Sequence, residues 1–96
     1  MNAESVLRTL RSEMDSLRNR YGIKSLGVFG SIVRGEDSPQ SDVDVLVEFQ
    51  TPSFDRYMDL KFHLEELLGR TVDLVLEESL KPALRDRILR EVRSVA

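Results

Sequence analysis

The stretch GVFGSIVRGEDSPQSDVDVLVEF, residues 27–49, decides the fold of this chain. It opens within an apolar run from Ile23 to Phe29, which glycines bound on both sides and which predicts a mostly buried strand. A Gly-Ser pair follows, then one helical turn and a segment from Glu36 to Ser41 with the composition of a loop. From Asp42 to Phe49 valines recur at every second position, which predicts a second strand with one apolar face. Two strands joined by a short turn therefore form the centre of the predicted fold.

Helical patterns flank these strands. Apolar residues at three- and four-residue steps predict helices from Ala3 to Arg20 and from Phe54 to Leu68, each followed by a glycine that ends it. A β-rich run from Thr71 to Leu76 predicts a third strand, and Pro82 opens a last helix whose apolar face continues to Val95. The order helix, strand, turn, strand, helix, strand, helix predicts an α/β (α+β) fold, a small mixed sheet with helices packed on it. We expect a single domain over residues 1–96.

Composition excludes several classes of protein. The chain has 96 residues, 41% of them hydrophobic and 32% charged, as in a soluble globular protein. It has no cysteine, which excludes disulfides, thiol nucleophiles and iron–sulfur clusters. No apolar segment is long enough for a signal peptide or a membrane span, so we expect a cytoplasmic protein without membrane contact. The net charge of −3 argues against direct binding of nucleic acid.

Acidic residues dominate the middle of the chain, where no Lys or Arg occurs between Glu36 and Asp55. Asp42 and Asp44 share one face of the second predicted strand, with Cα atoms about 6.5 Å apart. Two carboxylates in a partly buried cleft repel each other unless a divalent ion neutralises them, and hard oxygen ligands suit Mg²⁺. Asp73, central in the third predicted strand, is a candidate third ligand, although an acidic residue there could also simply face water at a sheet edge.

The Gly-Ser pair is suited to binding phosphate. Gly30 allows a sharp turn close to a phosphate, and Ser31 offers a hydroxyl and a backbone N–H at a helix start. The spacing of glycines from Gly30 to Gly35 resembles a Walker A loop, but the required lysine is missing. Arg34 either contacts a triphosphate or braces the acidic strand through an ion pair, and the sequence does not separate these two roles.

Gly30-Ser31, ten residues and then Asp42-Val43-Asp44 match the GS-x10-DxD signature of the polymerase-β-like nucleotidyltransferases. The resemblance implies the palm fold of that superfamily, ATP as substrate and two Mg²⁺ ions held by Asp42, Asp44 and Asp73. It also implies that Gly30 and Ser31 hold the terminal phosphates.

Over nearly its whole length the chain resembles the minimal nucleotidyltransferase (MNT) group of prokaryotes. Members act as antitoxins beside a small all-helical HEPN protein, a ribonuclease toxin, and transfer AMP from ATP to a tyrosine hydroxyl of that toxin. The resemblance thus implies a protein adenylyltransferase of a toxin–antitoxin pair related to type VII. Two alternatives stay open: an antitoxin that acts by binding alone, and an adenylyltransferase of small molecules such as aminoglycosides.

The chain is too short to carry a separate substrate-binding domain, so we expect a partner protein to supply the acceptor surface. Cations crowd the last predicted helix, either as a solvated face or as a docking surface for an acidic partner or nucleic acid. These cations are Lys81, Arg85, Arg87, Arg90 and Arg93.

Overall fold

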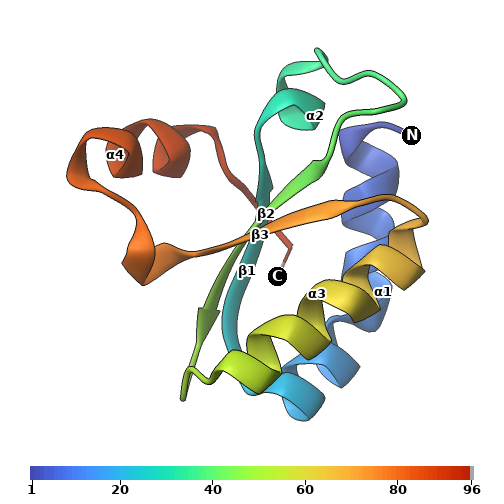
Figure 1. Ribbon diagram of the computed structural model, residues 1–96. Coiled ribbons are helices and arrows are strands. Elements are labelled where there is room, and N and C mark those ends of the chain that lie inside the picture. The colour runs from blue at the N-terminus through green and yellow to red at the C-terminus, as the bar shows by residue number, and fades with distance from the viewer. Residues whose placement is uncertain (96) are drawn as a thin grey trace.

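The computed structural model describes residues 1–95 (Figure 1). The elements in chain order are α1 (Ala3–Tyr21), β1 (Ile23–Phe29), α2 (Ser31–Arg34), β2 (Val43–Phe49), α3 (Phe54–Leu68), β3 (Val72–Leu76), the 3₁₀ turn η1 (Glu77–Ser79), α4 (Pro82–Glu91) and β4 (Arg93–Ser94). The predicted α/β class is confirmed, and the first helix, the second strand and the third strand each differ from the predicted bounds by one residue.

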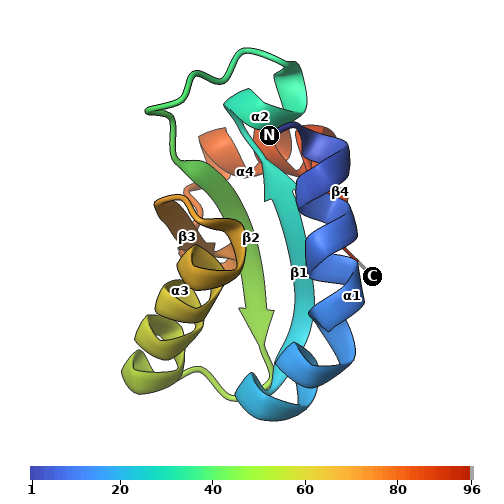
Figure 2. The same cartoon turned by 90° about the vertical axis from the view of Figure 1, so that its right-hand side faces the viewer.

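The strands form one mixed sheet in the order β3-β2-β1-β4. β1 pairs with β2 and with β4 in antiparallel fashion, whereas β2 and β3 are parallel. The parallel pair needs a crossover, and α3 supplies it. Because β2 and β3 run in the same direction, both strands begin at the same end of the sheet, beside the loop that follows α2 (Figure 2).

Helices α1 and α3 cover one face of the sheet, and α4 lies on the other (Figures 1 and 2). The core lies between the sheet and helices α1 and α3, where alternate residues of β2 meet the apolar faces of both helices. These buried residues include Leu7, Leu10, Leu17, Val43, Val45, Val47, Leu60 and Leu64. The opposite face of β2, which carries Asp44, is therefore left for α4 and for ligands.

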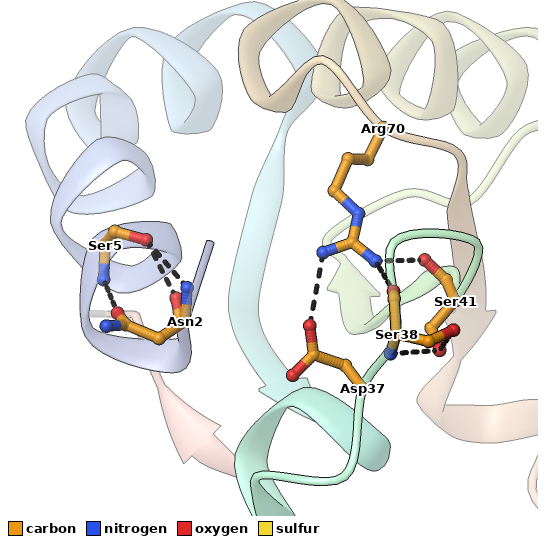
Figure 3. Close-up of polar contacts among 6 residues, drawn as sticks. All are labelled: Asn2, Ser5, Asp37, Ser38, Ser41 and Arg70. Carbon is orange, nitrogen blue, oxygen red and sulfur yellow. Dashed lines mark hydrogen bonds and ion pairs between the residues drawn. The ribbon is translucent and has the colours of Figure 1, made fainter.

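Local signals in the sequence explain the helix ends. Asn2 and Ser5 form a reciprocal capping box at the start of α1 (Figure 3), in which the Ser5 amide donates to the Asn2 side chain at 2.9 Å. At the start of α3 the Ser53 side chain accepts a single hydrogen bond from the Arg56 amide, at 3.1 Å. Gly22 ends α1 in the left-handed conformation, φ +65°, which a residue with a side chain adopts only at a cost.

The last predicted helix was wrong in its extent. α4 ends at Glu91, and the chain then turns into β4, which pairs along the free edge of β1. The Val95 side chain is buried, but from this edge rather than from a helix, and its amide donates to the Leu26 carbonyl at 2.9 Å. Pairing satisfies backbone groups of β1 that a continued helix would have left exposed.

None of the helices within residues 1–95 is both long and apolar enough to cross a membrane.

Candidate active site

The turn between β1 and α2 is fitted around Asp44. Gly30 has φ +82° and ψ −155°, a backbone conformation that only glycine adopts readily. A Cβ atom on Gly30 would lie 2.8 Å from Cγ of Asp44, so the carboxylate fills the space that a side chain would need. The sequence places these two residues 14 positions apart, and the structure brings them into contact. Gly30 is therefore needed both for its conformation and for its lack of a side chain.

Ser31 begins α2 directly after this turn, and the Gly30 carbonyl accepts hydrogen bonds from the amides of Val33 and Arg34. Within residues 1–95 the Ser31 hydroxyl has no hydrogen-bond partner. Its oxygen and proton are thus available to an incoming ligand.

The predicted acidic residues lie at one end of the sheet. Asp44 and Asp73 occupy paired positions on the parallel strands β2 and β3, so their side chains project from the same face. Asp42 lies one residue before β2 and is exposed, as is Asp73 at the edge strand. Asp44 is the most enclosed of the three.

The electrostatics of Asp44 reflect this grouping. Burial, together with the neighbouring charges of Asp73 and Asp42, raises the pKa of its carboxyl to about 6. Arg34 acts in the opposite direction and lowers the pKa. The site therefore holds an excess of negative charge that a bound cation would relieve.

The donor set fits a hard divalent cation such as Mg²⁺. Within residues 1–95 no three carboxylate or imidazole groups already surround a common point closely enough to enclose a metal ion. Mg²⁺ keeps much of its water shell and commonly uses one or two protein carboxylates together with phosphate oxygens. Asp44 with Asp73, joined by the adjacent Asp42, meets that need without a complete protein cage.

Arg34 was predicted either to contact a triphosphate or to brace the acidic strand. Its ion pairs within the described chain go instead to Glu91, with Nη1–Oε1 at 2.6 Å, and to Glu36, with Nε–Oε2 at 3.1 Å. The bracing of β2 by a direct ion pair is therefore wrong. The guanidinium still lies at the Gly30 turn and within electrostatic reach of Asp44.

A cavity of about 210 Å³ joins these groups. Its wall includes Gly30, Arg34 and Asp44 on one side and Leu84, Arg87 and Glu91 of α4 on the other. Larger hollows of about 560 and 510 Å³ lie elsewhere on the surface, but neither includes any of the predicted site residues. The small cavity is therefore the candidate active site, because its wall joins the Gly30 turn to Asp44, whereas Ser31, Asp42 and Asp73 lie outside that wall.

Arg70 is a residue that the sequence reasoning missed. Its guanidinium holds the loop between α2 and β2 (Figure 3), donating to the carbonyls of Ser38 at 2.7 Å and Ser41 at 2.6 Å and pairing with Asp37 at 3.4 Å. Because Asp42 directly follows this loop, Arg70 fixes the approach of the acidic strand to the site. A Gly-Arg pair before the third strand was the signal that could have indicated it.

The cationic last helix keeps its two interpretations. No residue of α4 is buried, and Arg85 pairs with Glu77 rather than with the acidic site. Arg87 lines the cavity, whereas Arg93 has left the helix and pairs with Glu4 of α1.

A half-buried carboxylate beside a glycine-serine turn, with an exposed carboxylate paired to it on the next strand, is an arrangement suited to metal-bound phosphates, and comparison with known proteins agrees with that class. The family model described as "Nucleotidyltransferase domain" matches residues 7–95, and the chain belongs to this family of enzymes. The protein adenylyltransferase MntA of Thermococcus cleftensis is 44% identical over 93 residues, which span 96% of this chain and 94% of that protein.

Solved structures show the same fold. One assigned as a minimal nucleotidyltransferase is 42% identical, with a TM-score of 0.81, and the match covers 97% of this chain and 95% of that one. A toxin–antitoxin structure with AMP-PNP gives a TM-score of 0.72 at 21% identity, covering 90% of this chain and 72% of that one. The MNT antitoxin complex with the tri-AMPylated HEPN toxin of Shewanella oneidensis gives 0.67 at 18% identity, covering 94% and 71%. The last two likenesses concern the fold alone.

Proposed function

We propose that this nucleotidyltransferase transfers AMP from ATP to a tyrosine hydroxyl of a small all-helical HEPN ribonuclease toxin and thereby acts as its antitoxin. The observation that carries the proposal is the placement of Asp44 against the Gly30 turn and level with Asp73. This placement puts one carboxylate of the proposed metal site against the glycine turn in a small cavity, with Asp73 at the paired position of the neighbouring strand.

Asp42, Asp44 and Asp73 would hold Mg²⁺, in one or two ions. When bound, the metal would neutralise charge on the triphosphate and on the leaving pyrophosphate. Ser31 would donate to the terminal phosphates through its hydroxyl and backbone N–H, and Arg34 would add positive charge at the same turn.

In the proposed reaction the tyrosine oxygen forms a bond to the α-phosphorus of ATP. The bond between that phosphorus and the oxygen that bridges to the β-phosphate breaks, and pyrophosphate leaves. The hydroxyl proton passes to a carboxylate, for which exposed Asp73 at the sheet edge is best placed, and then to solvent.

Two kinds of support favour a protein acceptor. The relative at 44% identity is a protein adenylyltransferase and matches this chain over almost its whole length. The cavity is also smaller than the pockets of roughly 300–1,000 Å³ that enclose small-molecule ligands, so ATP and its acceptor would both extend beyond it and leave room for a partner's surface.

The test is transfer of label from α-labelled ATP to the purified HEPN partner in the presence of Mg²⁺. The wild-type chain should label the partner and relieve its ribonuclease activity, and Asp44→Asn should lower labelling by at least about a thousandfold. Asp86→Asn, an exposed carboxylate change on α4, is the matched control and should behave as wild type. Circular dichroism would verify that each variant is folded.

The two alternative functions give different results in this assay. Equal relief of toxin activity by wild type and by the Asp44→Asn variant would indicate neutralisation by binding alone. Labelling of an aminoglycoside in preference to the partner protein would indicate an enzyme acting on small molecules.

A further inference from the structure

Glu91, the last residue of α4, contacts two groups at the glycine turn, the backbone N–H of Gly30 and the guanidinium of Arg34. Its Oε2 accepts a hydrogen bond from the Gly30 backbone N–H at 2.8 Å, and its Oε1 pairs with Arg34 Nη1 at 2.6 Å. The side chain is 17% exposed, less than half the exposure of the Arg34 side chain, at 37%. One carboxylate thus links the end of α4 to the turn that begins α2.

The charge on Glu91 is stabilised in this position. Burial alone would raise the pKa of its carboxyl, but the hydrogen bonds from Arg34 and Gly30 outweigh that effect and hold the pKa below its ordinary value. A carboxylate that accepts two such bonds forms a stronger link than a neutral side chain could.

The contacts of β4, the edge strand beside β1, fix the position of Glu91. Two residues beyond it the chain enters β4, where Arg93 pairs with Val28 and Ser94 with Gly27. Arg11 of α1 then holds this segment by donating to the carbonyls of Ser94, at 3.1 Å, and Val95, at 3.0 Å.

Close packing between these elements adds to the restraint. A Cβ atom at Gly27 would come within 2.5 Å of Cγ2 of Val92, the residue next to Glu91, so β1 and the end of α4 approach closely only because Gly27 has no side chain. Because β1 and α1 both hold β4, the Glu91 side chain is kept in one position beside the Gly30 turn.

We infer that Glu91 is a positioning residue for nucleotide binding, one that orients Arg34 and the Gly30 turn toward the terminal phosphates of ATP. The inference rests on the proposed function, in which those phosphates lie at this turn. Without the Glu91 carboxylate, the guanidinium of Arg34 would keep Glu36 as its only ion-pair partner within the described chain, on the solvent side, and would lose its fixed direction.

The experiment measures the dissociation constants of two ligands by calorimetry with Mg²⁺ present, the ATP analogue AMP-PNP and AMP. In the Glu91→Gln variant the amide oxygen still accepts from Gly30, but the amide group does not form the ion pair with Arg34. We expect the dissociation constant of AMP-PNP to rise about tenfold and that of AMP, which lacks the terminal phosphates, to change less than twofold.

Three further variants test whether Glu91 acts through its charge and through Arg34. Asp86→Asn, on the same helix, should bind AMP-PNP as wild type does. Glu91→Asp keeps the charge but is one methylene shorter, so we expect it to weaken AMP-PNP binding by a few fold while AMP binding is retained. In an Arg34→Gln background, adding Glu91→Gln should produce no further loss, because Glu91 acts through Arg34.

The outcomes separate this inference from the proposed function. Wild type that fails to bind AMP-PNP would contradict the proposed function and this inference with it. Wild type that binds, together with a Glu91→Gln variant whose affinity for AMP-PNP is unchanged or higher, would overturn the role of Glu91 alone. An equal loss of affinity for AMP-PNP and AMP would also overturn it, since a general disturbance of α4 would weaken both.

Discussion

At the scale of single residues, the contact between Gly30 and Asp44 joins the Gly30 turn to strand β2. Substitution of Gly30 by Ala would force a side chain into an unfavourable backbone conformation and against the Asp44 carboxylate. We expect Gly30→Ala to lower the free energy of unfolding by about 3 kcal/mol or more and to abolish AMP transfer.

Gly35 provides the matched control for that variant. Its φ is also positive, at +73°, but a Cβ atom there would meet no atom within 4 Å. Gly35→Ala should therefore cost only about 1 kcal/mol, the strain of the left-handed conformation alone. Urea unfolding measures both values, and equal losses in the two variants would show that crowding by Asp44 contributes nothing.

The raised pKa of Asp44 predicts a pH-dependent effect on stability. Because the folded-state pKa of about 6 lies above the ordinary carboxyl value of 3.8, the contribution of this group is favourable below pH 3.8 and is lost as the pH rises through about 6. Asp44→Asn removes this loss, so the variant should be more stable than wild type at pH 8, by about 1 kcal/mol after allowance for partial exposure.

Unfolding in urea at pH 4 and pH 8, in the presence of a chelator, measures this effect. The gain should be present at pH 8 and nearly absent at pH 4. A gain of the same size at both pH values would show that packing rather than ionisation distinguishes the variant, and Asp86→Asn should show no gain at either pH.

At the scale of elements, the loop between α2 and β2 depends on Arg70, which joins it to the start of β3. Its side chain is 14% exposed, and its removal would leave the Ser41 carbonyl without a protein donor and the Ser38 carbonyl with the Ser41 amide alone. We expect Arg70→Gln to cost about 2 kcal/mol of stability and to lower AMP transfer by tenfold or more, because Asp42 follows this loop.

Hydrogen exchange measured by mass spectrometry tests the cause. Exchange in residues 36–42 should speed up in Arg70→Gln and stay slow in Arg56→Gln, which removes an exposed arginine with a single carbonyl contact. An unchanged hydrogen-exchange rate in that loop would show that Arg70 does not hold it in place.

The elements also show how far sequence reasoning reaches. Periodicity and glycine positions predicted α1, α3 and the first three strands, because those signals are local to each segment. The same periodicity wrongly extended the last helix to Val95. Val92 and Val95 also suit an edge strand, and that strand forms only because β1 has a free edge to pair with. The contact of Glu91 with Gly30 spans 61 residues and depends on that strand, so nothing local could indicate it.

The candidate site was also predicted only in part from the sequence. Gly30, Ser31, Asp42 and Asp44 could be assigned to one site because their spacing matches the signature of a known family and falls on a predicted strand, turn and strand. That Asp73 lies level with Asp44 required the register of a parallel pair, which forms between strands separated by a whole helix. The ion pair of Arg34 with Glu91 required a tertiary contact across 57 residues and was missed.

At the scale of the whole molecule, the two faces of the sheet have separate tasks. One face is covered by α1 and α3 and contains the core, whereas the other carries Asp44 under an α4 that buries none of its own residues. Leu84 of α4 is 48% exposed at the mouth of the cavity. The catalytic face is thus incomplete as an enclosure, which agrees with an acceptor that brings its own surface.

This incompleteness predicts a strong preference for an intact protein acceptor. A free tyrosine or a short tyrosine peptide would find phosphate and metal ligands but few surfaces to hold its hydroxyl in line with the α-phosphorus, so the gain from orientation would be lost. With equal concentrations of acceptor, we expect AMP transfer to a peptide copied from the acceptor segment of the partner to be at least about a hundredfold slower than to the folded partner. The measurement is labelled AMP per minute on each acceptor, with Asp44→Asn as the blank for both. Comparable rates on peptide and folded partner would mean that the 210 Å³ cavity and its rim hold the acceptor unaided, and that the partner surface is dispensable.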